Sequence, residues 1–212
     1  MKTIFYLVRH GETASNEAGL IQGQTDSPLT DKGKEQALDI KNELSHIHFD
    51  AAFSSDLGRA YKTAQIILAE SNLEFNRSTL LRERNYGKFQ SRHHDRLFKE
   101  KRELLEKLDA ATKEERWDAK YEDDMESDKD VYERVASFIK NIAPEYKGKN
   151  VLIITHGGPM KVILIEKDYD EYAEIIKGNF DNTGYLKLTC DGSTIEIDEV
   201  VGFHRFSDLG NK

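Results

Sequence analysis

The chain has 212 residues, of which 38% are hydrophobic and 33% charged, with a formal net charge of -8 at pH 7. This composition is typical of a soluble globular protein that buries its core without disulfides, and the single cysteine, Cys190, cannot form an internal one. The negative charge disfavours nucleic acid or an anionic membrane as the main partner. Because the apolar runs are too short for a signal segment or a membrane span, we expect a cytoplasmic protein with no membrane partner.

The first third of the chain predicts two strands, each followed by a helix. Thr3–Val8 is apolar without polar alternation, which is typical of a strand buried on both faces. Apolar residues then recur at helical spacing over Ala37–Ile47, with Thr30 as the expected N-cap. Ala51–Phe53 predicts a second strand, and Ala60–Leu68 predicts a second amphipathic helix.

Residues 91–128 differ from the rest of the chain. They are dense in charge, lack a strand pattern and place four leucines at helical spacing, namely Leu97, Leu104, Leu105 and Leu108. We expect a helical insertion, which is either a lid over a functional site or a solvated excursion without function. Its basic residues could meet a second anionic group of a ligand or balance neighbouring acids; they are Arg92, Arg96, Lys99, Lys101 and Arg102.

The last third predicts a helix, a buried strand and a hairpin. Val131–Ile142 has helical periodicity, and Val151–Thr155 is a continuous apolar run. Tyr185–Leu188 and Thr194–Ile197 alternate and flank Asp191-Gly192, which is a hairpin signal.

Strands separated by helices imply a mostly parallel sheet with helices on both faces. The sequence therefore predicts the α/β class and a single domain over residues 1–212. We expect three layers, α/β/α, with the hairpin as an antiparallel edge and a helical insertion at about residues 91–128.

Two predicted strands end in histidine followed by glycine. Arg9-His10-Gly11 follows the first strand, and His156-Gly157-Gly158 follows Val151–Thr155. Ligands of open parallel sheets gather beyond the carboxyl ends of the strands, so both imidazoles meet at one rim if these strands are neighbours. One such histidine is usually structural, but two favour a functional site. We also expect Gly11 to leave room for a ligand and the segment after it to offer N–H donors to an anion.

Arg59 lies in the first turn of the second predicted helix, within the motif Ser54–Ala60. A cation there opposes the helix dipole, an arrangement that makes sense if an anion lies between the guanidinium and the helix end. The alternative is a surface arginine that extends along its helix.

These motifs together resemble the histidine phosphatase superfamily, in its phosphoglycerate-mutase-like branch. The similarity touches most of the chain except residues 91–125 and follows the family's order, in the blocks Leu7–Thr13 with Asn16, Gln22–Gly33, Ser54–Ala64, Leu81–Phe89, Glu126–Val135 and Thr155–Gly158. The resemblance implies a phosphoglycerate-mutase-like fold and phosphoryl chemistry at a histidine.

The resemblance also implies catalytic roles. His10 would attack phosphorus and become a phosphohistidine, while Arg9, Arg59 and His156 would hold the phosphoryl oxygens. Glu83 would protonate the leaving oxygen and then activate water. Without the resemblance, Glu83 would be interpreted as one side of a surface ion pair with a neighbouring arginine.

Four further residues would bind substrate in this resemblance. Asn16 would add an amide donor to the phosphate, and Gln22, Gly23 and Gly157 would lie near the pocket. Arginines can neutralise the phosphomonoester dianion and stabilise its transition state, so we expect no metal and no other cofactor.

The choice between hydrolysis and phosphoryl transfer depends on a few residues. Glu83–Gly87 resembles the acid loop of the mutases, except that Asn85 stands where those mutases tend to have histidine. Mutases also carry an adjacent arginine pair beyond this loop, whereas this chain has no two adjacent arginines there. Gly157-Gly158 is more similar to the phosphatases.

We therefore favour a phosphatase that hydrolyses a small-molecule phosphomonoester. One alternative is a phosphoglycerate mutase, and another is a non-catalytic module that binds phosphoesters. The sequence leaves a homodimer open.

Overall fold

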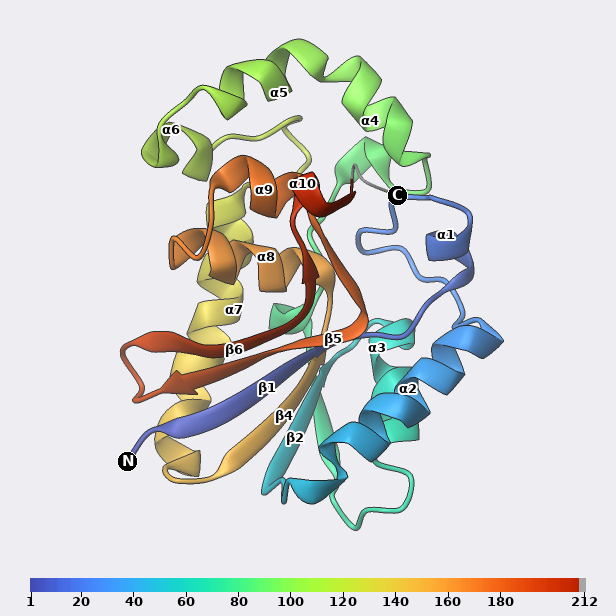
Figure 1. The fold of residues 1–212 in the computed structure, drawn as a ribbon, viewed down its shortest axis with the longest axis vertical. Helices are drawn as coiled ribbons and strands as arrows, with labels where there is room; N and C mark the ends of the chain where they lie inside the picture. Colours follow the sequence, from blue (N-terminus) through green and yellow to red (C-terminus); the bar gives the residue numbers. More distant parts are fainter. Residues whose placement is uncertain (210–212) are drawn as a thin grey trace.

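A six-stranded sheet forms the centre of the molecule, in the order β3-β2-β4-β1-β5-β6 (Figure 1). The structure is a computed structural model that describes residues 1–209, apart from the side chains of Phe98, Leu105 and Asp109. The strands are β1 (Thr3–Arg9), β2 (Ala51–Ser55), β3 (Phe75–Ser78), β4 (Asn150–Thr155), β5 (Asn179–Cys190) and β6 (Ile195–His204). The first four are parallel, whereas β5 runs antiparallel to β1, and β6 runs antiparallel to β5.

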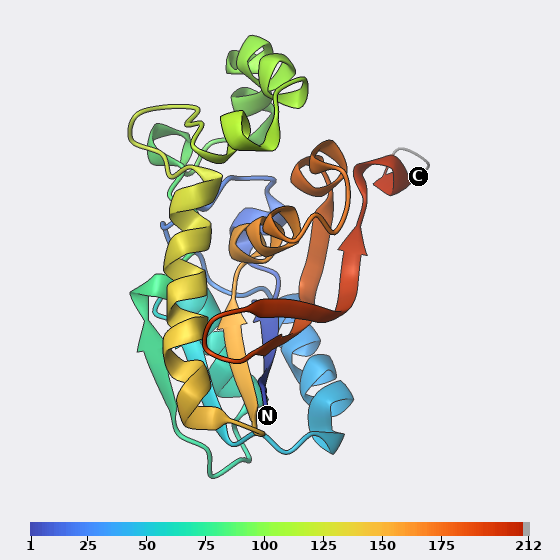
Figure 2. The same cartoon turned by 90° about the vertical axis from the view of Figure 1, so that its left-hand side faces the viewer.

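Helices cover both faces of this sheet, which confirms the three-layer α/β/α fold class (Figures 1 and 2). One face is covered by α2 (Asp31–Glu43) and α3 (Gly58–Ile67), the other by α7 (Asp128–Ile142) and α8 (Gly157–Glu166). Alternate residues of β1 enter the two cores: Phe5 and Leu7 pack toward α7 and α8, Tyr6 and Val8 toward α2 and α3. Because both faces of β1 are buried, its sequence is continuously apolar.

The predicted N-cap of α2 is confirmed, and a second helix, α7, has a cap that was not assigned from the sequence. Thr30 caps α2 by accepting a hydrogen bond from the N–H of Gly33, and Ser127 caps α7 in a capping box with Asp130. The other short elements are α1 (Ala14–Glu17), α9 (Tyr172–Lys177), α10 (Phe206–Leu209) and the 3-10 turns Leu44–His46, Thr79–Leu81, Gly87–Phe89 and Ala143–Tyr146.

The sequence missed the edge strand β3 and underestimated the hairpin. Phe75–Ser78 has one apolar residue in four and lies at the sheet edge, so it carries no periodic signal. The hairpin strands β5 and β6 extend beyond the predicted segments, because their outer halves pair with each other away from β1.

The charged segment forms the helices α4 (His94–Glu100), α5 (Arg102–Asp109) and α6 (Lys113–Trp117), as the leucine spacing predicts. They form an arc at the end of the molecule toward which the arrow of β4 points (Figures 1 and 2). Leu97 and Leu108 are buried and Leu104 is half-buried, while the side chain of Leu105 lies outside the described residues. Leu97 packs in a small core with Ile21, Phe89 and Met125. Within residues 1–209, no helix combines the length and apolar character that a membrane span requires.

Candidate active site

The two strand-histidine-glycine junctions meet at the carboxyl edge of the sheet. β1 and β4 are adjacent and parallel, and Arg9 lies opposite Thr155 in their register. His10 and His156 therefore leave the sheet side by side, with ring centroids 5.1 Å apart. Both are buried, with exposed fractions of 2% and 0%. The expected shared rim is confirmed.

Hydrogen bonds determine which nitrogen of His10 carries the proton. Arg59 Nε donates to His10 Nε2 at 3.1 Å, so Nε2 is unprotonated. The proton is then on Nδ1, which donates to the carbonyl of Gly11 at 2.7 Å. Burial, together with the positive charges of Arg59 and Arg9, lowers the pKa of His10 well below its ordinary value. His10 is therefore a neutral imidazole with its Nε2 lone pair on the side of the arginine.

Arg59 is buried rather than extended along the surface of its helix. Its exposed fraction is 1%, and its Nη1 and Nη2 donate to the carbonyls of Thr25 and Gly23 at 2.8 and 2.7 Å. Burial lowers the pKa of Arg59 to about 10, so the guanidinium keeps its charge at neutral pH. Gly23, one of the predicted pocket residues, thus contributes a carbonyl that holds the arginine.

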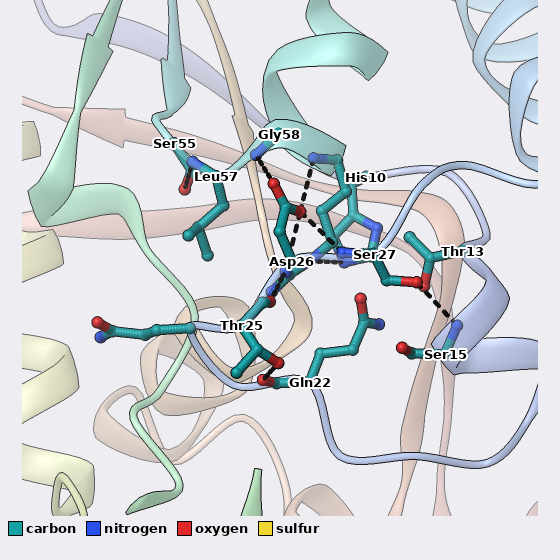
Figure 3. Close-up of polar contacts among 12 residues, drawn as sticks. His10, Thr13, Ser15, Gln22, Thr25, Asp26, Ser27, Ser55, Leu57 and Gly58 are labelled. Carbon is teal, nitrogen blue, oxygen red and sulfur yellow. Dashed lines mark hydrogen bonds and ion pairs between the residues drawn. The ribbon is translucent and has the colours of Figure 1, made fainter. Parts of the chain in front are cut away.

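The anion near the start of α3 is Asp26, which belongs to the protein itself (Figure 3). Its carboxylate accepts from the N–H groups of Gly58 at 2.7 Å and Arg59 at 3.2 Å, and lies 3.7 Å from Arg59 Nη1. The helix end that the sequence suggested for an anion is therefore capped by this side chain. The guanidinium of Arg59 lies beside this carboxylate and also reaches His10, to which its Nε donates.

The expectation of free N–H donors after His10 is wrong. The backbone N–H groups of Gly11, Glu12 and Thr13 donate to side-chain oxygens of Thr63, Gln36 and Asn16. Each donor is already satisfied within the protein, so this turn fixes its own shape instead of presenting an anion nest.

The role expected for Gly11 is also corrected. A Cβ on Gly11 would lie 2.2 Å from the carbonyl oxygen of Gly33, and one on Gly33 would lie 2.0 Å from the carbonyl oxygen of Glu12. The missing side chains let the first turn of α2 pack directly on the turn after His10. They make room for backbone, not for a ligand.

Several buried polar atoms in this site have no hydrogen-bond partner among the described residues. They are Arg9 Nε, Gln22 Oε1 and both ring nitrogens of His156. Arg9 donates through Nη1 to the carbonyl of Phe180, and this hydrogen bond fixes the position of its guanidinium. Burial and the charge of Arg59 lower the pKa of His156 well below its ordinary value, so it too is neutral. An unsatisfied buried polar group costs about 1–3 kcal/mol, so this cluster indicates a site for a polar ligand.

Glu83 reaches the same rim from the loop that follows the turn Thr79–Leu81. Its carboxylate accepts from the N–H of Arg84 at 2.7 Å and from that of Gly158, in the first turn of α8, at 3.2 Å. The surface ion pair is not formed, because Arg82 binds Asp56 and Arg84 binds Asp128. A Cβ on Gly158 would lie 2.0 Å from Glu83 Oε1, so glycine at this position admits the carboxylate.

Arg134 of α7 holds the Glu83 loop, a function that sequence reasoning did not assign. Its guanidinium donates to the carbonyls of Leu80, Arg82 and Glu83 at 2.9, 2.6 and 3.0 Å. The carboxylate of Glu126 accepts from its Nε at 2.8 Å. The sequence offered only the presence of Glu126 and Arg134 in one matched block, since the carbonyls that Arg134 binds lie about 50 positions away.

The other predicted binding residues, Asn16, Gln22 and Gly157, differ in their contacts. Asn16 accepts from Thr13 through Oδ1 in a capping box, so this oxygen has a partner within the protein. Gln22 is buried, with an exposed fraction of 8%. Gly157 begins α8, where an added Cβ would lie 3.7 Å from Arg9 Nε.

Two of the basic residues in the insertion balance acids. Arg96 pairs with Glu100 at 2.6 Å, and Lys101 pairs with Glu122 at 2.5 Å. Both pairs are partly exposed, and neither needs an external anion.

Fold and site together define an α/β protein with paired neutral histidines, a buried Arg59 and a half-buried Arg9 at the carboxyl edge of its sheet. The family described as the histidine phosphatase superfamily (branch 1) matches residues 5–201, and the chain belongs to this superfamily. "Probable phosphoglycerate mutase GpmB" of Escherichia coli is 35% identical over 152 residues, which cover 72% of this chain and 68% of that protein.

Solved structures show the same fold. A phosphoglycerate mutase from Bacillus anthracis str. Sterne superposes with a TM-score of 0.81 and 27% identity, covering 99% of this chain and 96% of its own. The alpha-ribazole phosphatase from Shigella flexneri gives a TM-score of 0.73 and 26% identity, covering 94% and 96%. Relatives with two kinds of named activity therefore share this architecture.

Proposed function

We propose that this protein is a metal-independent phosphatase that hydrolyses phosphomonoesters through a phosphohistidine at His10 Nε2. The observation that carries this proposal is the pair of hydrogen bonds on the His10 ring, from which its tautomer follows. With its proton held on Nδ1 by the Gly11 carbonyl, the imidazole presents an unprotonated Nε2 to the Arg59 guanidinium. A neutral, buried imidazole surrounded by cationic donors suits attack on a phosphate dianion.

In the first step, the donors of Arg9, Arg59 and His156 bind the phosphoryl oxygens. The Arg59 Nε–H moves its hydrogen bond from His10 to phosphate, which frees the Nε2 lone pair. Nε2 then forms a bond to phosphorus as the ester P–O bond breaks, and protonated Glu83 gives its proton to the leaving oxygen. Acid catalysis of this kind contributes about 10²–10⁴-fold, most for poor leaving groups.

In the second step, water attacks phosphorus and the P–N bond breaks. Glu83, now a carboxylate, takes a proton from the water, and inorganic phosphate leaves. The positive charge of the two arginines supports both transition states, where charge accumulates on the equatorial oxygens.

Hydrolysis is favoured over mutase activity by the glycine pair that starts α8 and by the absence of an adjacent arginine pair after the Glu83 loop. Phosphoglycerate mutase activity is the second candidate, because the 35% identical relative is named a probable enzyme of that kind. The two candidates share the phosphohistidine and differ in its acceptor, which is water or a second hydroxyl of the substrate.

Phosphate release from p-nitrophenyl phosphate in EDTA tests the proposal, with native protein, His10→Ala and the control His48→Ala. His48 is exposed and remote from the rim, so its variant should keep native turnover. We expect release that survives EDTA and disappears only in His10→Ala. A native protein that releases no phosphate but interconverts phosphoglycerates would favour the mutase, and binding without any turnover would favour a binding module.

A further inference from the structure

A bulge in β5 lies beside the end of β1, where Arg9 and His10 are located. β5 pairs with β1 only as far as Val8 opposite Tyr185. On its other edge, the register with β6 jumps from Phe180–Phe203 to Tyr185–Val201, so residues 181–184 oppose Gly202 alone. The regular ladder of β1 therefore stops before His10 on the β5 side.

The bulge has a defined shape. Thr183 has φ 65°, a left-handed conformation that is rare for a β-branched residue. A Cβ on Gly202 would lie 3.1 Å from Gly184 Cα, so the two strands touch through bare backbone. Asp181 and His204 bridge the strands at 2.8 Å. Asn182 lies within this bulge, between Asp181 and Thr183.

Asn182 replaces the strand hydrogen bond that the bulge removes. Its Nδ2 donates to the carbonyl of His10 at 3.0 Å. The N–H of the same peptide group, contributed by Gly11, donates to Thr63 Oγ1 at 3.1 Å. One peptide plane is thus held at both ends, by a side chain from β5 and a side chain from α3.

We propose that Asn182 is a positioning residue for His10, which acts by fixing the plane of the His10–Gly11 peptide. The imidazole projects from one end of this peptide, and the Gly11 carbonyl that binds its Nδ1–H follows at the other. Rotation of the peptide would move the ring and its proton acceptor relative to each other. Asn182 thereby maintains both the direction of Nε2 and the tautomer. This inference rests on the proposed role of His10 as nucleophile.

The contact between Arg9 and Phe180 predicts which kinetic constant changes when the Asn182 amide is removed. Arg9 donates to the carbonyl of Phe180, two residues before Asn182, through a bond that does not involve the Asn182 side chain. Removal of the amide therefore leaves the phosphate-binding guanidinium in place. The loss should appear in kcat, while KM stays near its native value.

The test compares Asn182→Ala and the shape-matched Asn182→Leu with native protein on p-nitrophenyl phosphate across pH 5 to 8. Misplacing a reacting atom by about 1 Å can cost on the order of 100-fold, so we expect kcat to fall about 10–100-fold. Thr63→Val should cause a similar fall. The double variant should lose less than the product of the two single losses, because both side chains hold one peptide. His204→Ala removes the bridge to Asp181 without touching His10, and should retain native kcat.

Nitrogen-15 NMR of labelled histidine supplies a readout that does not depend on turnover. Native His10 should show the single tautomer protonated at Nδ1, and Asn182→Ala should show a mixture. A native tautomer and native kcat in both Asn182 variants would overturn the inference. So would an equal loss in His204→Ala, since the bulge alone would then be responsible, or a rise in KM that accounts for the whole effect. If the native protein hydrolyses no phosphoester, the proposed function fails, and the NMR comparison alone decides the role of Asn182.

Discussion

The ends of β1 and β4 carry the same local pattern, a buried strand followed by histidine and glycine, yet their imidazoles have opposite environments. Both ring nitrogens of His10 have protein partners, Arg59 and the Gly11 carbonyl. Neither ring nitrogen of His156 has one among the described residues. The His10 ring is held by hydrogen bonds within the protein, whereas the nitrogens of the His156 ring are available to a ligand. In the proposed function, the first ring supplies the nucleophile and the second a phosphate-binding group, although their local motifs are equivalent.

The largest expected effect separates these two roles directly. His156→Ala should lower kcat about 10²–10³-fold, the usual cost of one transition-state donor, whereas His10→Ala should leave no phosphohistidine pathway at all. Steady-state turnover and trapping of phosphorylated enzyme measure both. A His156→Ala enzyme that is as inactive as His10→Ala, with no trapped intermediate, would show that the two imidazoles are not separable in this way.

The glycine pair after His156 sharpens the comparison, because it has no counterpart after His10. Gly158→Ala places a Cβ where Glu83 Oε1 lies, while a Cβ at Gly157 makes only an ordinary 3.7 Å contact with Arg9 Nε. We expect Gly158→Ala to lower kcat on the order of 100-fold for alkyl phosphates, and less for p-nitrophenyl phosphate, whose leaving group needs little protonation. Gly157→Ala is the matched control and should stay near native. Equal losses in both variants would indicate a general distortion of α8.

Arg59 contacts His10 in addition to its proposed role in phosphate binding, so its removal should change the pH profile. Burial is the largest cause of the low pKa of His10, and the positive charge of Arg59 is the next. In Arg59→Met that pKa should rise, and the acidic limb of kcat/KM, which reports protonation of the nucleophile, should move to higher pH. The measurement is kcat/KM against pH for native and variant enzyme. An acidic limb that stays in place would mean that another group controls it.

The smallest effect concerns stability. Both histidines are buried and neutral, with pKa values well below the ordinary 6.5. Below about pH 6.5 the unfolded chain binds protons at these positions and the folded chain does not, so the free energy of unfolding decreases as pH falls. The slope approaches about 1.4 kcal/mol per pH unit for each histidine. Urea denaturation between pH 7 and 5 should show a shallower slope for His156→Gln than for native protein, and identical slopes would contradict this origin.

Much of the fold followed from local sequence. Buried strands, amphipathic helices and the hairpin turn each leave a periodic or turn signal within about ten residues, and Thr30 was identified as a cap from its position alone. β3 was missed because four edge residues with one apolar side chain leave no such signal. That the two histidines and Glu83 lie at one rim could be predicted, since they occupy strand ends or a recognisable block.

The sequence by itself determined which chemical groups are present at the rim and in what order along the chain. Only the tertiary structure decided how each is held, because the deciding contacts join distant positions. Asp26 occupies the start of α3, Gly11 makes room for Gly33, and Asn182 reaches His10 across 172 positions. A hydrogen bond depends on distance and angle in space, and neither is encoded in a short window of residues.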